Sequence, residues 1–308
     1  MTILTESIRL AAGLHPAVAP DDYHADCALE PSLSSSLARV LVAQTPKHAW
    51  LAHPRLNPKF VAETNSAFDL GSAVHDYLAG GAARIKIVPN LKDWRTAAAQ
   101  EQRAAARDAG LIPLLTHQFE QVIDIAAVAK ETAVKEGINL GMQECVLIAE
   151  DKGAWLRAMM DSLAPPWIND WKVTKINLAN DAALARHIVD MGYDMRAAFY
   201  IHVAELVFPD LAGRINFRWL WLEEDEPHGL RIIEADATMR EMGRRKMQYA
   251  IDCWRECLRN DRWPHFENLP RRLPYPDWKE REWLEREVAP TSVMGPVEML
   301  GRMDGGQL

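Results

Sequence analysis

The sequence predicts an α/β fold in which a central β-sheet is flanked by helices. Three strand-length apolar runs begin near Gln143 and are separated by turns built on Asp-Lys-Gly and Ala-Pro-Pro. Helical patterns precede these runs, and further helices and strands follow them. Helices, then strands, then mixed elements are the order expected of one α/β domain with helical additions.

Composition limits the class of protein. The chain has 308 residues, of which 48% are hydrophobic and 25% charged, so it can bury a core. Its formal net charge of −8 argues against a protein that coats nucleic acid non-specifically, although it leaves room for a local basic groove. Without a membrane-length apolar stretch or a secretory leader, and with four scattered cysteines, we expect a cytoplasmic protein with no membrane partner.

The segments ahead of the sheet region are mainly helical. The elements expected there are helices over 37–50, 71–78, 94–109 and 116–135 and a strand over 84–89. Serines at 34–36 can cap the first helix, and Pro46 breaks it. Gly80 closes the second. The two longer helices are interpreted as an insertion between the early helices and the sheet.

The sheet region and the segments after it alternate strands with helices. The strands are expected over 144–151, 155–163, 167–175, 215–224 and 229–236, and the helices over 180–191, 193–208, 239–258 and 279–287. We expect residues 1–290 to form one domain and residues 291–308 to form a flexible tail.

The stretch from 155 to 175 places charged residues where they can do chemistry. Asp161 ends one predicted strand, and Asp170 and Lys172 lie two apart on the next, so their side chains share a face. Two carboxylates brought together by a hairpin suit Mg²⁺, which prefers oxygen ligands, and Mn²⁺ can replace it. The lysine would orient a water or offset charge on a phosphate. Alone the pattern is weak, because a solvated hairpin with an incidental ion pair is the more common origin of such charges.

The surrounding motifs resemble the PD-(D/E)xK nuclease superfamily, and more specifically its RecE-type phage and prophage exonucleases (exonuclease VIII C-terminal domain). The resemblance is carried, in the family's order, by SLSSSLARVLV, GSAVHDYL, DWRTAAAQEQRAAARDAGLIPL, WLRAMMDSL with INDWKVTK, GYDMRAAFYIHV and CLRNDRWPHF. These motifs are spread over most of the chain.

The resemblance implies a restriction-endonuclease-like core, a mixed central sheet flanked by helices, with N-terminal and inserted helical segments. It implies a Mg²⁺-dependent exodeoxyribonuclease acting on linear double-stranded DNA ends in recombination, as a ring-shaped homo-oligomer working with a single-strand annealing protein. The catalytic residues that it implies are Asp161, Asp170, Lys172 and His75. The metal ligands that it implies are Asp161, Asp170, His75 and the backbone carbonyl of Trp171.

Two residues depart from the family pattern. Arg196 stands where the family has Gln in a Gln-x-x-x-Tyr motif, and it shares a helical face with Tyr200. Both are predicted to flank the DNA strand. Trp171 replaces a branched aliphatic residue between the acid and the lysine. Glu144 matches a family glutamate near the active site, and a solvent-facing glutamate at a strand start is an equal alternative.

The cysteines and a basic run are further candidate sites. An iron–sulfur cluster needs four thiolates, but only Cys253 and Cys257 stand near the C-terminal end, so no cluster is expected. The basic residues within 240–246 are as consistent with a phosphate-facing patch as with a solvated face.

Two other functions stay open. The arginine at 196 and the acidic charge are consistent with a catalytically inactive DNA-binding or assembly protein on a nuclease-derived scaffold. Such a protein would bind DNA ends without metal-dependent cleavage. A different metal-dependent hydrolase would instead have a small-molecule pocket and no basic groove.

Overall fold

The computed structural model describes residues 8–61, 69–267 and 270–288. Its contacts divide the chain into two units, residues 1–265 and residues 266–308. The second unit contains α10 (Asp277–Val288), which confirms the helix predicted there. The predicted tail lies outside the described residues, and the domain boundary predicted at residue 290 stays a prediction. Across the described residues, every helix is too short or too polar to traverse a membrane.

The helices of the first unit follow the predicted order. They are α1 (Pro20–His24), α2 (Ser35–Ala43), α3 (Pro46–Leu51), α4 (Asp69–Leu78), α5 (Ala97–Asp108), α6 (Thr116–Lys135), α7 (Asp181–Asp190), α8 (Tyr193–Val207) and α9 (Ala237–Asn260). The Ser34 side chain caps α2 by accepting a hydrogen bond from the backbone N–H of Leu37. Pro46 starts α3, as expected from its fixed φ. The short helix α1 was not predicted.

The strands form a main sheet and a small separate one. They are β1 (Gly13–His15), β2 (Ser32–Ser34), β3 (Ile85–Val88), β4 (Ile112–Leu115), β5 (Met142–Asp151), β6 (Ala154–Ala164), β7 (Trp167–Thr174), β8 (Asn216–Glu223) and β9 (Leu230–Ile233). The main sheet has the order β1-β5-β6-β7-β8-β9, with β2 beside β6, and β3 pairs with β4. The β2–β6 and β7–β8 pairs are parallel and the others in the main sheet are antiparallel, so the predicted mixed sheet is confirmed. The short strands β1, β2 and β4 were missed.

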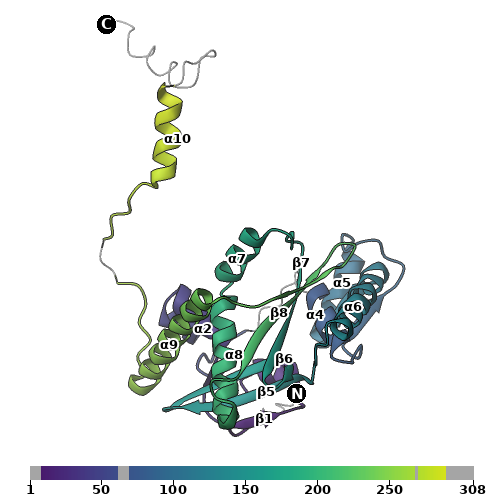
Figure 1. The fold of residues 1–308 in the computed structure, drawn as a ribbon, viewed down its shortest axis with the longest axis horizontal. Coiled ribbons are helices and arrows are strands. Elements are labelled where there is room, and N and C mark those ends of the chain that lie inside the picture. The colour runs from purple at the N-terminus through teal and green to yellow at the C-terminus, as the bar shows by residue number, and fades with distance from the viewer. Residues whose placement is uncertain (1–7, 62–68, 268–269, 289–308) are drawn as a thin grey trace, which may run out of the picture. The chain divides into compact units, whose positions relative to one another are not determined.

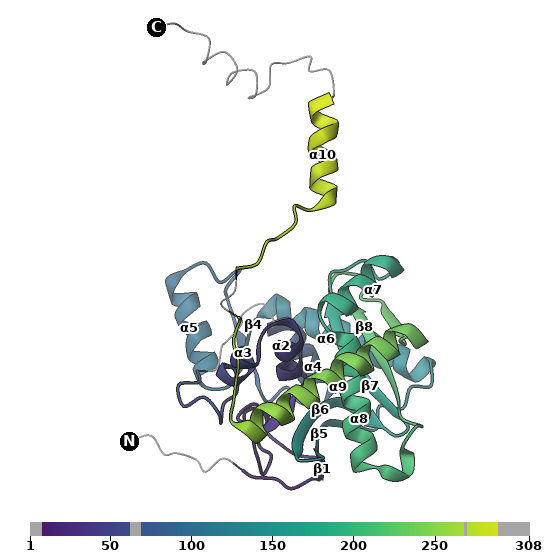
Figure 2. The same cartoon turned by 90° about the vertical axis from the view of Figure 1, so that its left-hand side faces the viewer.

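Helices cover both faces of the sheet. Figure 1 shows α2, α8 and α9 on one side of the strands and α4, α5 and α6 on the other, and Figure 2 shows α9 running across the first layer. Trp219 and Trp221 of β8 pack into the core beneath α2, α8 and α9. The alternate residues Leu220 and Leu222 pack beneath α4 and α6, together with Trp171 of β7. Strands buried on both faces explain the continuous apolar runs of the sequence.

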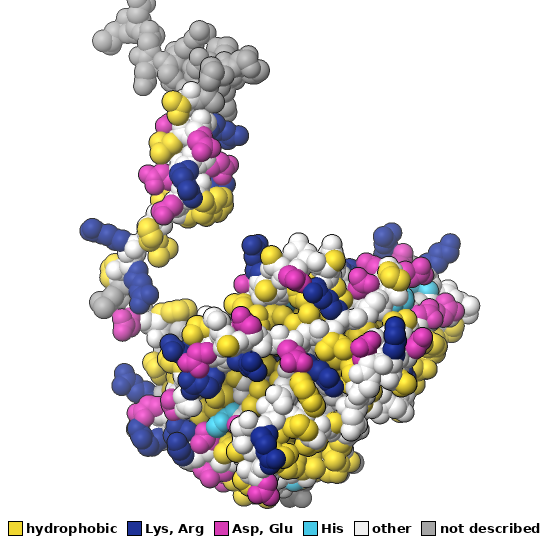
Figure 3. Space-filling model, in the orientation of Figure 1, with side chains coloured by type: hydrophobic (Ala, Val, Ile, Leu, Met, Phe, Trp, Pro, Cys, Tyr) yellow, Lys and Arg dark blue, Asp and Glu magenta, His cyan; other side chains and the backbone are white. Residues whose placement is uncertain are grey.

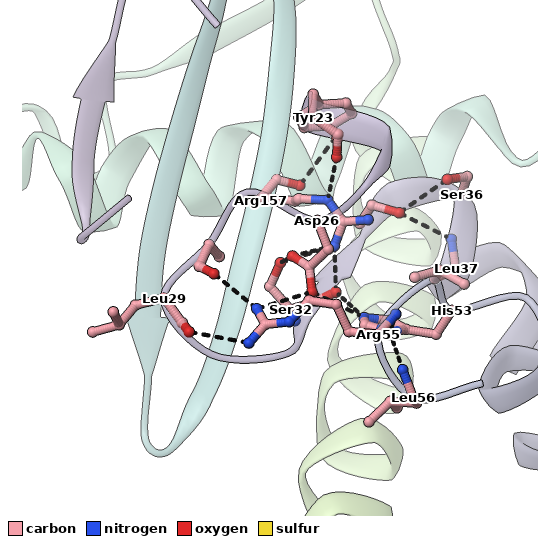
Figure 4. A network of polar contacts seen from close by, with 12 residues as sticks. Tyr23, Asp26, Leu29, Ser32, Ser36, Leu37, His53, Arg55, Leu56 and Arg157 are labelled. Carbon is pink, nitrogen blue, oxygen red and sulfur yellow. Dashed lines mark hydrogen bonds and ion pairs between the residues drawn. The ribbon is translucent and has the colours of Figure 1, made fainter. Parts of the chain in front are cut away.

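A buried polar network fastens the N-terminal segment to β6 (Figure 4). Arg157 of β6 pairs with Asp26 at 3.0 Å and donates a hydrogen bond to the hydroxyl of Ser32 at 2.8 Å. Asp26 also lies 3.2 Å from His53 and 3.4 Å from Arg55. Burial opposes ionisation of Asp26, but the hydrogen bond from His53 and the charge of Arg157 outweigh it and lower the pKa of that carboxyl. The network therefore holds a compensated charge beneath β2 and α2.

Replacing Asp26 by alanine is expected to destabilise the fold strongly. Arg157 is 3% exposed and would lose its carboxylate partner, and breaking a buried ion pair costs about 3–5 kcal/mol. Urea denaturation of Asp26→Ala should show this loss in the free energy of unfolding. Glu30→Ala, an exposed acid in the same segment, should change it by no more than about 0.5 kcal/mol. Equal losses in the two variants would contradict the role given to the network.

Candidate active site

A pocket of about 600 Å³ lies beside α4, β5, β6, β7 and the start of α8. The polar residues that line it are His24, Arg39, Ser72, His75, Arg84, Glu144, Asp161, Lys172, Tyr193 and Arg196. Segments that are far apart in the sequence therefore bring together most of the predicted site residues. Asp170 is not among the residues that line the pocket, but its carboxylate contacts the Lys172 ammonium.

The sequence predicts that Asp161 ends its strand. In the structure, β6 continues beyond Asp161 to Ala164. The described pairs between β6 and β7 extend only from Ala164 with Trp167 to Ser162 with Asn169. Beyond these pairs, the Asp161 side chain connects the two strands: its Oδ2 atom accepts a hydrogen bond from the backbone N–H of Trp171 at 2.8 Å. This bond places the Asp161 carboxylate beside the Asp170-Trp171-Lys172 segment.

Asp161 is also the centre of a set of potential metal ligands. One ligand atom each from His75, Glu144 and Asp161 lies within 4.8 Å of the other two. The His75 Nδ1 atom on α4 is 3.4 Å from the Asp161 Oδ2 atom on β6. Glu144, the weakest candidate in the sequence, thus belongs to the same cluster as the two stronger ones.

An irregular backbone accompanies Glu144. Its φ is 51°, in the left-handed region that a non-glycine residue rarely adopts inside a strand. The β5–β6 pairing passes from Gln143 with Ser162 to Cys145 with Met160, so the ladder is interrupted where Glu144 lies opposite Asp161. Residues held in such sparsely populated conformations gather at functional sites. Sequence alone carries no signal for this distortion.

The charged groups of the cluster shift one another's pKa values. Burial opposes ionisation of Asp161, but the charge and hydrogen bond of His75, together with Lys172, outweigh it and lower the pKa of Asp161 to about 2. Burial lowers the pKa of His75, but the adjacent Asp161 carboxylate outweighs this effect and raises it. Burial and the charge of Asp161 raise the pKa of Glu144 to about 7. At neutral pH the Asp161 carboxyl is therefore ionised, whereas the Glu144 carboxyl has its pKa close to the pH. Shifted pKa values of this kind are common at catalytic sites.

Asp170 and Lys172 share one face of β7, as their spacing of two predicts. Asp170 is 1% exposed, and its carboxylate makes an ion pair with the Lys172 ammonium. Neither oxygen of Asp170 accepts a hydrogen bond of regular geometry, and burial raises the pKa of this carboxyl. Lys172 Nζ also donates a hydrogen bond to the carbonyl oxygen of Trp171 at 2.8 Å. The ammonium thus binds both β7 groups that the sequence assigned to a metal.

The chemistry of these groups fits a hard divalent cation. Three carboxylates, an imidazole and a backbone carbonyl are the donors, and oxygen predominates among them, as Mg²⁺ and Mn²⁺ require. The buried oxygens of Asp170, which lack regular hydrogen bonds, are groups that a cation would satisfy.

The helix α8 places two residues on the pocket and one behind it. The guanidinium of Arg196 lies 5.4 Å from the centre of the Tyr193 ring, and both residues line the pocket. Tyr200 is 6% exposed and meets Phe217 edge-on in the core, with ring centres 6.3 Å apart. The predicted DNA contact of Tyr200 stays a prediction, and Tyr193 is the tyrosine that α8 presents to the pocket.

The structure adds two arginines that the sequence did not reveal, Arg39 and Arg84, and Arg84 is paired with Asp76. Arg39 of α2 lines the pocket, and among the described residues it makes no hydrogen bond or ion pair. Its side chain runs along Gly192, where an added Cβ would lie 3.3 Å from the Arg39 Cδ atom. Packing of α2 against α8 brings Arg39 here, and no local pattern in the sequence reports that packing.

Three of the four basic residues within 240–246 on α9 are ion-paired. Arg244 and Arg245 both pair with Glu241, at 2.9 and 2.7 Å, and Lys246 pairs with Asp194 at 2.7 Å. Figure 3 shows basic and acidic side chains interspersed over this helix. Of the two interpretations left open for this run, the structure favours the solvated face.

Comparisons with known proteins agree with this architecture. A family model described as a PDDEXK-like domain of unknown function (DUF3799) matches residues 35–268. No curated protein matches the chain. A crystal structure titled "Putative exonuclease" from Eubacterium rectale is 16% identical, covers 89% of this chain and 99% of its own, and has a TM-score of 0.52. The predicted fold is therefore confirmed.

A second solved structure is more distant. It is titled a phage related exonuclease from Haemophilus somnus 129PT, is 12% identical, and covers 66% of this chain and 98% of its own. Its TM-score of 0.30 is too low to support a common fold.

The metal-free protein is expected to lose stability with rising pH through Glu144. The pKa of this carboxyl is about 7 in the folded protein against an ordinary value of 4.5, so the folded state binds the proton more tightly than the unfolded chain does. The resulting stability is full below pH 4.5 and is lost as the pH rises through about 7. Calorimetry in EDTA should therefore show that Glu144→Gln gains Tm relative to the wild type between pH 5 and pH 8.

Glu120→Gln, at an exposed position on α6, is the matched control and should follow the wild-type curve. Parallel Tm curves for Glu144→Gln and the wild type would contradict the raised pKa.

Proposed function

The chain belongs to the PDDEXK-like family (DUF3799), which confirms the superfamily predicted from its motifs, and on this premise we propose that it is a divalent-metal-dependent deoxyribonuclease. The observation that carries the proposal is the convergence of His75, Glu144 and Asp161, whose ligand atoms lie within 4.8 Å of one another. The pair formed by Asp170 and Lys172 lies directly beside them, joined through the Asp161–Trp171 hydrogen bond.

The residues that would hold the metal are Glu144, Asp161, Asp170, His75 and the carbonyl of Trp171. A bound Mg²⁺ or Mn²⁺ ion supplies Lewis-acid polarisation of a phosphodiester and a more acidic water at neutral pH. The protein contributes the fixed donors. Asp161 is held by His75 and by the backbone of Trp171, so its carboxylate is oriented before any ligand arrives. Such preorganisation is what a metal site needs from its surroundings.

Lys172 is the candidate for handling the attacking water and the phosphate charge. Its ammonium lines the pocket, and in this conformation it contacts Asp170 and the Trp171 carbonyl. A cation fixed at this position stabilises the negative charge that develops on a phosphate during hydrolysis. It can also hold a water by donating a hydrogen bond to it.

Two arginines are the candidates for DNA contacts. Arg39 on α2 and Arg196 on α8 both line the pocket, and neither makes a described ion pair with a protein carboxylate. Unpaired guanidinium groups bind phosphate oxygens in a bidentate manner. Because these cations are local, the protein can hold a DNA strand in its pocket despite a net charge of −8.

The finer parts of the proposal come from the RecE-type motif order and from the exonuclease title of the neighbouring structure. They are hydrolysis from the ends of linear double-stranded DNA, Mg²⁺ as the metal, a ring-shaped homo-oligomer and a single-strand annealing partner in recombination. A cytoplasmic location is proposed from the four scattered cysteines.

The alternatives receive less support from the geometry. An inactive scaffold would not need the His75–Asp161 and Lys172–Asp170 pairs side by side at one pocket. A small-molecule hydrolase would place its metal ligands in a cavity suited to such a substrate. The cavity of about 340 Å³ between α8 and α9 is lined by none of the candidate ligands.

Removing either aspartate is expected to abolish metal-dependent cleavage. Even an outer partner of a metal ligand is worth about 10- to 100-fold, so Asp161→Asn and Asp170→Asn should each lower the cleavage rate by more than about 100-fold. The assay is degradation of linear duplex DNA with Mg²⁺ and with EDTA. Asp124→Asn, an exposed aspartate on α6, should remain active. Wild-type rates in both aspartate variants would refute the proposal.

Arg39→Ala is expected to weaken DNA binding without removing the metal site. The loss of one phosphate contact should lower affinity at every sequence and reduce the slope of log affinity against log salt by about one. Fluorescence anisotropy in EDTA at several salt concentrations measures both quantities. Lys135→Ala, an exposed cation outside the pocket, is the control. An unchanged slope for Arg39→Ala would show that this guanidinium does not contact DNA.

A further inference from the structure

One aromatic ring lies against two cations of the pocket, Lys172 and Arg196. The Lys172 Nζ atom is 5.2 Å from the centre of the Tyr193 ring, and the Arg196 guanidinium carbon is 5.4 Å from it. Both distances are within the range of about 6 Å in which a cation is attracted to the face of an aromatic ring. Tyr193 therefore contacts the proposed catalytic lysine and a proposed DNA-binding arginine at once.

The ring is held in place from behind. Tyr193 is the first residue of α8, after Gly192 with a φ of 69°. Its ring packs against Trp221, which is 1% exposed, with centres 6.0 Å apart, and against His187 at 5.9 Å. His187 and Trp221 are also in contact with each other, at 5.8 Å. This packing restricts the ring and makes it a fixed surface for the two cations.

The contacts of the Lys172 ammonium show why such a surface is needed. The ammonium has three N–H groups, and it contacts the Asp170 carboxylate, the Trp171 carbonyl oxygen and the Tyr193 ring. Under the proposed function, on which this inference rests, the first two of these groups are donors to the metal. A bound divalent cation would compete with the ammonium for both of them. The Tyr193 ring is the remaining contact.

We propose that Tyr193 is a positioning residue that keeps the Lys172 ammonium in the pocket when a divalent metal takes the Asp170 carboxylate and the Trp171 carbonyl. Without the ring, the flexible lysine side chain is free to leave for solvent. The Arg196 guanidinium lies against the same ring, with its central carbon 5.4 Å from the ring centre.

The inference predicts a loss of turnover without a loss of metal binding. Tyr193→Leu removes the aromatic face and should lower kcat by about 2- to 30-fold, the range expected for one cation–π contact. Its dissociation constant for Mg²⁺, measured by calorimetry, should stay within about threefold of the wild-type value, because no donor is removed. Tyr193→Phe keeps the face and should restore kcat. Tyr249→Leu, at a tyrosine that is 60% exposed on α9, is the control.

A double-mutant cycle separates positioning from general damage. If Tyr193 acts through Lys172, then Tyr193→Leu should cause little further loss of residual turnover in a Lys172→Ala background. A further loss in that background as large as the loss in the wild type would overturn the inference.

The position of Lys172 can also be observed without turnover. In NMR spectra of lysine-labelled protein, the Lys172 side-chain signals should carry a ring-current shift that depends on Tyr193. The signals are assigned by their absence in Lys172→Arg. This shift should survive saturation with Mg²⁺ in the wild type and in Tyr193→Phe, and it should be absent in Tyr193→Leu. Loss of the shift on Mg²⁺ binding to the wild type would show that Lys172 leaves the ring and would refute the inference.

The two proposals fail in different ways. If the proposed function is wrong, Mg²⁺ neither binds at the site nor supports cleavage that depends on Asp161. If only the positioning inference is wrong, Mg²⁺ binds and cleavage depends on Asp161, but the Lys172 shift disappears or the double-mutant cycle is additive.

Discussion

The site depends on the compensation of two carboxylates that the fold brings together inside the protein. Asp161 and Asp170 lie on adjoining strands, and each is costly to ionise there unless a cation is close. His75 compensates the first and Lys172 the second. The same requirement makes the site receptive to a divalent metal, which would take over a charge balance that the ammonium of Lys172 maintains in this conformation.

This constraint gives the inserted helices a function. His75 lies on α4, and the start of α4 is tied to α5 because Asp69 pairs with both Arg103 and Arg107. The helices predicted as an insertion therefore help to hold His75, a proposed metal ligand, against β6. From the other side, Arg157 fixes β6 to the N-terminal segment through Asp26. The strand that carries Asp161 is thus held at two points by charged pairs, at Arg157 and at Asp161 itself.

Sequence reasoning recovered the parts of the site that local periodicity or motif resemblance encodes. The spacing of two between Asp170 and Lys172 places both side chains on the same face of any strand, and the resemblance implied His75. The sequence could not show the positive φ of Glu144 or the interrupted ladder beside it, because both are properties of the folded backbone. Tyr193 and Arg39 were missed because helix packing brings them to the pocket. The short strands β1, β2 and β4 gave too little pattern to be seen.

The central claim is that a divalent metal binds among the carboxylates around Asp161. Anomalous diffraction from crystals grown with Mn²⁺ tests it most directly, because the signal locates the ion without any assumption about activity. The account predicts an anomalous peak within coordination distance of the carboxylates of Glu144, Asp161 and Asp170, with Lys172 displaced from Asp170. A Mn²⁺-saturated crystal with no peak at these carboxylates, and with the Lys172–Asp170 ion pair intact, would contradict it.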